Sequence, residues 1–189
     1  MQELVILTGI PGTGKSTVAE LAIKGTGYNI VNYGTVITQA LKQDGHIETP
    51  DDIRAKLNQN VWVDYQQKAA QNISKSEGRI LLTTHSAFAS PHGYFPGLPF
   101  DILQEFRPAP KAIVIIEAPI EQLQRRQKTD TDRTRGYDFE SNISEFLEMN
   151  RSYAVAYSAL TRARVKIINN LEHRVEKAAK ELRLLLLEL

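Results

Sequence analysis

Eight residues near the start of the chain have the types and spacing of a phosphate-binding loop. They fit the pattern GxxxxGK[ST] and read Gly9-Ile10-Pro11-Gly12-Thr13-Gly14-Lys15-Ser16. Glycines let the backbone curl so that successive N–H groups face phosphate oxygens, and a helix that begins there adds partial positive charge. We expect the loop, through Thr17, to bind a nucleoside triphosphate, with Lys15 on the β- and γ-phosphates and the Ser16 hydroxyl on Mg²⁺. The alternative is a glycine turn with an incidental lysine. It does not explain why the motif lies between a predicted buried strand and a predicted helix.

A second group of chemistry-bearing residues is the cationic stretch between residues 125 and 135. It contains Arg125, Arg126, Lys128, Arg133 and Arg135, which outnumber two aspartates. Phosphoryl transfer concentrates negative charge, so a site for it needs cations aimed at the transferring group. We predict a short mobile lid over about residues 128–137 that closes over the donor and excludes water. A solvated charged loop paired with its own aspartates is the alternative.

The remaining motifs discriminate between classes of nucleotide-binding protein. A GTPase would carry an NKxD-like base reader, which the sequence lacks, and an AAA or helicase motor would carry an acidic pair at the end of a later strand. Here the strand around Ile80 runs instead into Thr83-Thr84-His85-Ser86. A kinase for a sugar or shikimate hydroxyl gains from a carboxylate near that hydroxyl, and none follows this strand. We therefore expect a small kinase whose acceptor is itself a phosphate.

Composition is consistent with this class. The chain has 189 residues, no cysteine and a net charge of +1 from 23 Lys and Arg against 22 Asp and Glu. One domain over residues 1–189 is expected from this length. The near-neutral balance argues against a nucleic-acid-coating protein, and no apolar run approaches the roughly 18 residues that a membrane span needs. The absence of a basic segment before the first apolar run predicts no signal peptide.

The elements that must position these residues alternate along the chain. Short apolar runs predict buried parallel strands, and helical patterns between them imply right-handed crossovers, hence an α/β fold with helices on both faces of a five-stranded sheet. The expected strands are 4–7, 29–31, 79–82, 112–116 and 165–168. The expected helices are 14–24, 35–42, 51–76, 119–127, 138–160 and 172 onward.

Four blocks of residues, in order along nearly the whole chain, resemble the archaeal-type adenylate kinases, which have the P-loop NTPase fold. They are Gly9–Thr17; Asn32-Tyr33-Gly34-Thr35; Thr84-His85-Ser86 with Gly93-Tyr94-Phe95-Pro96-Gly97-Leu98-Pro99; and Asn150-Arg151 with Val165-Lys166-Ile167-Ile168. The resemblance implies phosphoryl transfer from ATP to AMP giving two ADP, with Mg²⁺ as cofactor, in the cytoplasm, by a homotrimer. Extra apolar residues at Leu184 and Leu187 are compatible with a subunit contact, although a helix sunk between neighbours explains them about as well.

The resemblance also assigns roles to individual residues. It implies that Arg125 or Arg126 lies near the donor adenine and that Arg133, Arg135 and Arg151 contact phosphates. The segment of about residues 33–76 is expected to bind the acceptor.

Within that acceptor side we expect Arg54 to grip the AMP phosphate, although a surface helix residue is the alternative. Tyr33, Gly34 and Thr35 are expected to border the acceptor adenine or ribose, or to be simply a helix-start turn. His85 and Ser86 are expected at a strand end where ligands bind. His85 is then a positioning residue or a buried structural histidine, since an AMP phosphate needs no base.

The sequence departs from the family at one position. It also leaves two rival functions open. The family usually carries an aspartate where this chain has Thr83. That aspartate helps to hold Mg²⁺, so we predict weaker metal binding. The rival functions are a kinase preferring CMP or UMP, and an AMP-independent ATPase acting as an assembly factor.

Overall fold

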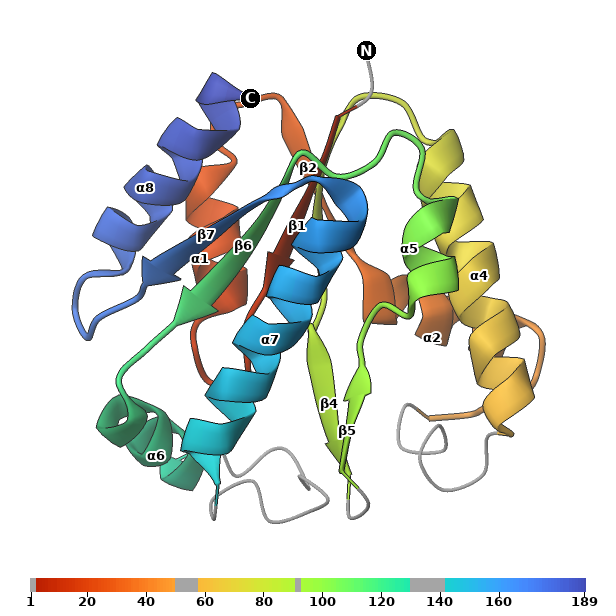
Figure 1. Ribbon diagram of the computed structural model, residues 1–189, viewed down its shortest axis with the longest axis horizontal. Helices are drawn as coiled ribbons and strands as arrows, with labels where there is room; N and C mark the ends of the chain where they lie inside the picture. Colours follow the sequence, from red (N-terminus) through yellow and green to blue (C-terminus); the bar gives the residue numbers. More distant parts are fainter. Residues whose placement is uncertain (1–2, 50–57, 91–92, 130–141) are drawn as a thin grey trace.

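A five-stranded parallel sheet forms the centre of the computed structural model, which describes residues 3–49, 58–90, 93–129 and 142–189 (Figure 1). The strand order is β2-β3-β1-β6-β7. The strands are β1 (Glu3–Thr8), β2 (Tyr28–Asn32), β3 (Arg79–Thr83), β6 (Ala112–Glu117) and β7 (Arg164–Asn169). The predicted fold class, strand number and parallel direction are confirmed. Within the described residues, no helix is long and apolar enough to cross a membrane.

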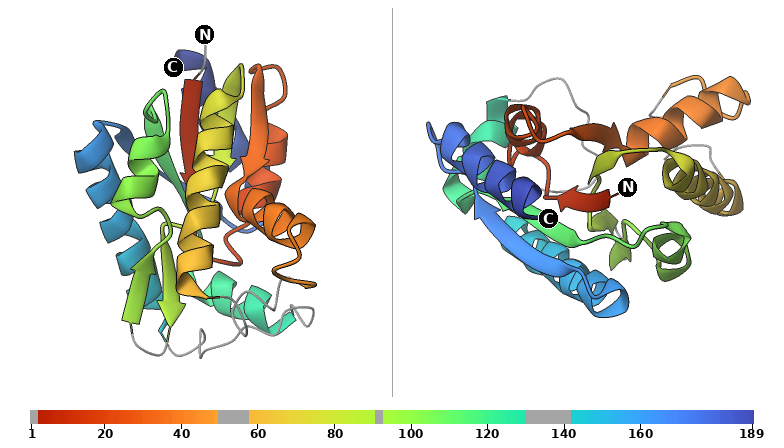
Figure 2. Two further views of the ribbon diagram at one scale, coloured as in Figure 1. Left: turned by 90° about the vertical axis from the view of Figure 1, so that its right-hand side faces the viewer. Right: turned by 90° about the horizontal axis from the view of Figure 1, so that it is seen from above.

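Helices cover both faces of the sheet, as the view along the sheet in Figure 2 shows. The helices are α1 (Lys15–Ala22), α2 (Tyr33–Gln43), α4 (Gln59–Lys75), α5 (Phe100–Glu105), α6 (Ile120–Thr129), α7 (Ile143–Thr161) and α8 (Val175–Glu188). Side chains alternate across each strand, so Val5 and Leu7 pack with α1 and α8, whereas Leu4 and Ile6 pack with α2, α4, α5 and α7. This two-sided burial is the reason that the central strands are continuous apolar runs.

The predicted helix boundaries shift where capping groups decide them. Asn32 caps α2 by accepting a hydrogen bond from the Thr35 N–H at 3.0 Å, so this helix begins at Tyr33, two residues earlier than predicted. Asn58 caps α4 in the same way through Asn60. The predicted helix starts at residues 51 and 138 lie outside the described residues.

Two elements escaped prediction. An antiparallel hairpin joins β4 (Ala87–Ser90) to β5 (Gly93–Pro96), and the short helix α5 follows it. The hairpin extends past the carboxyl end of the sheet, on the same side as α6 (Figure 1). It therefore lies at the edge where parallel sheets bind ligands.

Candidate active site

The loop between β1 and α1 has the backbone geometry that its glycines predict. Gly14 caps α1 in the left-handed conformation, with φ of 79°. A Cβ on Gly9 would lie 2.5 Å from the main-chain oxygen of Ile116 on β6, so this position tolerates no side chain. The loop thus passes directly over the end of the neighbouring strand.

Side chains from three other segments hold the loop from outside. The Asn170 Nδ2 donates to the Thr13 carbonyl at 2.8 Å, and Arg126 donates to the Gly12 carbonyl at 2.8 Å. The Nδ1 of His85 lies 3.1 Å from the Gly9 carbonyl. The C=O and N–H of a trans peptide point in opposite directions, so the Thr13–Asn170 bond turns the Gly14 N–H to the other side. These three contacts thereby give the loop a shape suited to binding an anion.

Lys15 lies at the meeting point of the loop and β3. Its ammonium donates to the Thr84 carbonyl at 2.5 Å. Burial lowers the pKa of Lys15 to about 8. Among the described residues no acidic side chain pairs with this ammonium, so a phosphate oxygen would supply the opposite charge and the side chain is suited to an anionic ligand. Ser16 and Thr17 are exposed at the start of α1, where hydroxyls are accessible to a nucleotide or metal.

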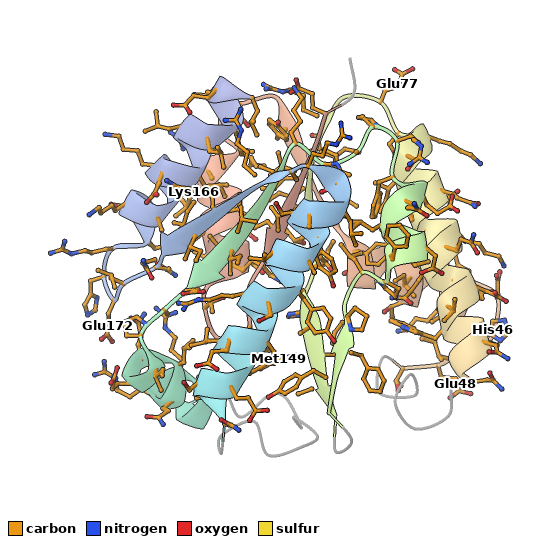
Figure 3. The ribbon with its side chains drawn as sticks, viewed as in Figure 1. His46, Glu48, Glu77, Met149, Lys166 and Glu172 are labelled. Atoms are coloured by element: carbon orange, nitrogen blue, oxygen red, sulfur yellow. The ribbon has the colours of Figure 1, made fainter. Side chains whose placement is uncertain are left out.

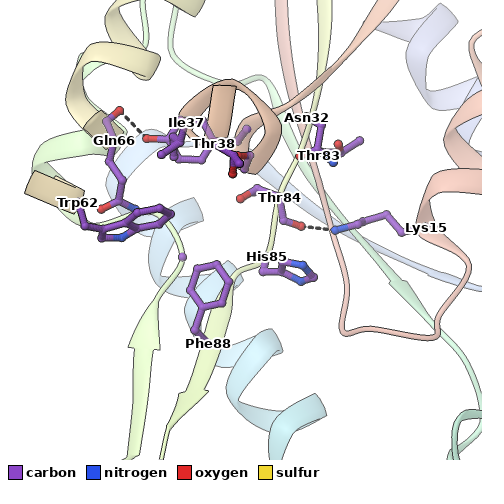
Figure 4. Close-up of a pocket in the computed structure, with 13 residues that line it drawn as sticks. Lys15, Asn32, Ile37, Thr38, Trp62, Gln66, Thr83, Thr84, His85 and Phe88 are labelled. Atoms are coloured by element: carbon purple, nitrogen blue, oxygen red, sulfur yellow. Dashed lines mark hydrogen bonds between the residues drawn. The ribbon is translucent and has the colours of Figure 1, made fainter. Parts of the chain in front are cut away.

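A pocket of about 260 Å³ adjoins Lys15 on the side of α2 and α4 (Figure 4). It opens at the carboxyl ends of β2 and β3. Its walls are Lys15, Asn32, Tyr33, Gly34, Ile37, Thr38, Trp62, Gln66, Thr83, Thr84, His85, Phe88 and Gly97. Lys15 lies at one end of the view and Trp62 with Gln66 at the other, so the pocket extends from the phosphate loop toward α4.

Two of the three predicted acceptor residues at the start of α2, Tyr33 and Gly34, line this pocket. Tyr33 is buried, its hydroxyl donates to the Gln66 main-chain oxygen at 2.7 Å, and burial raises its pKa above the ordinary value. Gly34 lines the pocket, while the Thr35 N–H belongs to the helix cap. The structure therefore shows the helix-start turn at these residues. Their contact with an acceptor stays a prediction.

His85 and Ser86 follow β3 but have different surroundings. The His85 ring lines the pocket and packs against Phe88, with ring centroids 5.5 Å apart. The Ser86 hydroxyl is buried and donates to the Thr8 hydroxyl at 2.8 Å. Its main-chain oxygen accepts from the Tyr157 hydroxyl at 2.6 Å. Ser86 thus ties β3 to β1 and α7, and its predicted substrate contact stays a prediction.

The predicted arginines occupy separate places around the loop. Arg126 reaches the loop itself, whereas Arg125 pairs with Glu172 at 2.8 Å; Glu172 lies on the turn between β7 and α8 (Figure 3). Arg151 donates to Glu117 through Nε at 2.6 Å and through Nη2 at 2.5 Å, and this bonding raises its pKa. Arg54, Arg133 and Arg135, with the lid from residue 130 onward, lie outside the described residues.

Sequence reasoning missed several residues that build this site. Glu117, Gln66 and Asn170 are each buried, with 2–4% of their surface exposed. A buried polar residue in a folded chain calls for a partner or a ligand, but nothing in the spacing of a single sequence marks it as buried. Glu117 had one usable signal, because it ends an otherwise apolar strand run.

The side-chain oxygens of the described residues indicate how Mg²⁺ could be held. No group of three or more His, Asp or Glu side chains suited to a metal occurs among the residues that the structure describes. Thr83, at the end of β3, is buried and its hydroxyl donates to the Val31 carbonyl at 3.4 Å. The donors near Lys15 are thus hydroxyls, which fit an ion held mainly by nucleotide phosphates and water.

Comparison with known proteins places this site in a family. A family model described as AAA domain matches residues 8–144, so the chain belongs to that broad domain family. An adenylate kinase of Thermoplasma acidophilum is 40% identical over 94% of both chains. Adenylate kinases of Methanopyrus kandleri and Methanocaldococcus jannaschii are 43% and 37% identical over at least 95% of each chain. The chain belongs to the archaeal adenylate kinases.

Solved structures agree with the fold of these kinases. A shikimate kinase from Bacteroides thetaiotaomicron superposes with a TM-score of 0.64 at 17% identity, covering 99% of both chains. A gluconokinase from Sinorhizobium meliloti gives 0.54 at 14% identity, covering 98% of this chain and 94% of that one. At such identities these likenesses concern the fold alone. The adenylate kinase relatives, which match over 94–96% of each chain, make the chain a nucleoside monophosphate kinase and confirm the predicted enzyme class.

Proposed function

We propose that this adenylate kinase transfers a phosphoryl group reversibly from ATP to AMP and forms two ADP. The observation that carries the proposal is the pocket that continues from Lys15 between α2 and α4. The phosphate loop accounts for a donor nucleotide, and the pocket provides adjacent space for an acceptor. A simple ATPase has no need of a second nucleotide-binding space beside its phosphate loop.

The chain's own residues divide the work between the two nucleotides. Lys15 neutralises phosphate charge at the junction, and Arg126, held at the Gly12 carbonyl, lies on the donor side of the loop. Glu117 orients the Arg151 guanidinium beside the loop, where it can stabilise charge on the transferring group. In this proposal Arg133 and Arg135 approach from the lid, and Arg54 holds the acceptor phosphate.

Mg²⁺ is the cofactor in this proposal, and the Ser16 hydroxyl is its protein ligand. The ion would supply positive charge to the donor's phosphates. The Thr83 hydroxyl carries no charge and is directed to Val31, so we expect the ion to be held less tightly than an aspartate at this position would allow.

We also propose a homotrimer that works in the cytoplasm. Support for assembly comes from α8, where Leu184 and Leu187 are 51% and 54% exposed. Large apolar side chains on one exposed helix surface favour a subunit contact. Sedimentation at micromolar concentration tests this proposal, and a monomer would exclude it.

Measuring ADP formed from ATP with and without AMP tests the main proposal. AMP-dependent formation of two ADP for each ATP consumed is the expected result. ADP formation at the same rate without AMP would instead identify an ATPase. Replacing AMP by CMP or UMP at fixed ATP then tests the alternative acceptor preference.

A further inference from the structure

Asn150 on α7 has a buried amide that contacts Thr8, the residue directly before the phosphate loop. Only 1% of the surface of Asn150 is exposed. Its Oδ1 accepts from the Thr8 hydroxyl at 3.5 Å, and its Nδ2 has no hydrogen-bond partner among the residues that the structure describes. The one bond is long, and an unpartnered buried N–H is destabilising. Fold stability alone would favour an apolar side chain at this position, so the amide calls for another explanation.

Asn150 and its neighbour Arg151 attach α7 to two adjacent strands. The Asn150 amide contacts Thr8, the last residue of β1, and the Arg151 guanidinium donates twice to Glu117, the last residue of β6. β1 and β6 are hydrogen-bonded neighbours in the sheet, and α7 lies across one face of the sheet (Figure 1). A single contact would leave the helix free to pivot about it. Contacts from two consecutive residues fix both its rotation and its position along the strands.

The contact of Asn150 continues into a buried chain of hydroxyl groups. Ser86 donates to the Thr8 hydroxyl at 2.8 Å, and the Thr8 hydroxyl donates in turn to Asn150. Thr8 and Ser86 are both fully buried. A hydroxyl has one hydrogen, so the Thr8 hydroxyl can donate to a single acceptor, and Asn150 provides it. The chain thus sets the register between the segment after β3, the start of the phosphate loop and α7.

We propose that Asn150 is a positioning residue for Arg151: through the Thr8 hydroxyl it holds α7 in the register that directs the Arg151 guanidinium to the transferring phosphoryl group. This inference rests on the proposed function, which gives Arg151 its contact with phosphate. A displacement of about 1 Å in a catalytic group is enough to lower the rate roughly 100-fold. Asn150 therefore raises the rate although its amide lowers stability, a trade-off that is common around active sites.

Asn150→Leu tests the assignment, because leucine has a similar branched shape without polar atoms. Its kcat should fall roughly 10- to 100-fold. The KM for ATP and the KM for AMP should each change less than about twofold, because the lost alignment acts on the transition state. The melting temperature should stay close to that of wild type, since the substitution removes the unpartnered N–H together with one long bond. A wild-type kcat in this variant would overturn the inference.

Substitutions at Thr8 break the same contact from the other side. Thr8→Val should give a similar loss of kcat, whereas Thr8→Ser keeps the hydroxyl and should retain the wild-type rate. The variant with both Asn150→Leu and Thr8→Val should lose no more than the larger single loss, because both changes remove one contact. Ser152→Ala is the matched control on α7, because Ser152 is exposed and its hydroxyl donates to the Glu148 carbonyl of the same helix. It should change neither kcat nor KM.

Adding Asn150→Leu to Arg151→Ala separates positioning from general packing. Because Asn150 acts through Arg151, the added substitution should lower kcat less than about twofold in this background. A further loss as large as that in the wild-type background, or multiplied losses in the Asn150 and Thr8 double variant, would overturn the inference. Where Arg151→Ala leaves too little activity to measure, the Asn150 and Thr8 pair decides.

Should Asn150→Leu fail to fold, Asn150→Ala takes its place in the same comparisons. A wild-type enzyme that forms no ADP from AMP would overturn the proposed function instead.

Discussion

Binding of Mg²⁺-ATP to the free enzyme should take up a proton at Lys15 in mildly alkaline solution. Burial lowers the pKa of this ammonium to about 8, and its hydrogen bond goes to the uncharged Thr84 carbonyl. Donor phosphates placed against it favour the charged form and should return its pKa toward the ordinary value. Because the bound state then holds the proton more tightly, uptake must grow as the pH rises past the pKa of the free enzyme.

The size of the uptake follows from the two pKa values. At pH 8.5 a group with a pKa of about 8 is about one quarter protonated, so restoring a pKa near 10.4 takes up about 0.7 proton. At pH 7.0 the same group is already charged, and the uptake is about 0.1 proton. The affinity for ATP should correspondingly weaken as the pH rises above 8.

Isothermal titration calorimetry in two buffers of different ionisation enthalpy measures this uptake directly. Lys15→Arg is the control, because a guanidinium remains charged throughout and should show none of the increase between pH 7.0 and 8.5. If the variant binds ATP too weakly to titrate, the pH dependence of the wild type decides alone. An uptake at pH 8.5 no larger than that at pH 7.0 would refute the reasoning.

Three further predictions concern the metal, the lid and the loop. Thr83→Asp should lower the Mg²⁺ concentration for half-maximal rate by roughly tenfold, because a carboxylate adds charge near the ion; an unchanged requirement and rate would count against this. Arg135→Ala should reduce kcat on the order of 10³- to 10⁵-fold while thermal melting stays close to wild type, and near-normal turnover would remove the lid assignment. Asn170→Ala deletes the bond to the Thr13 carbonyl and should raise the KM for ATP by roughly 5- to 10-fold, whereas an equal rise for AMP would contradict a role on the donor side.

Local sequence was enough to predict the sheet and the phosphate loop. The loop depends on a contiguous run in which Gly14 must adopt a left-handed conformation and Lys15 follows immediately, so its signal survives without any tertiary information. The central strands are buried on both faces, which makes them continuous apolar runs that are easy to recognise. The β4–β5 hairpin has strands of four residues each, too short for a clear alternation of polar and apolar side chains, and it was missed.

Chain folding alone decided which polar residues meet at the site. Tyr33 and Gln66 are 33 residues apart, and Asn170 is 157 residues from Thr13, yet hydrogen bonds join each pair. Gln66 looks like an ordinary surface residue in the sequence, because burial is set by what packs around a side chain and not by its neighbours in the chain. The sequence by itself predicted that a triphosphate binds at the loop. The packing of α2 and α4 beside the ends of β2 and β3 decided where the proposed acceptor nucleotide has room beside it.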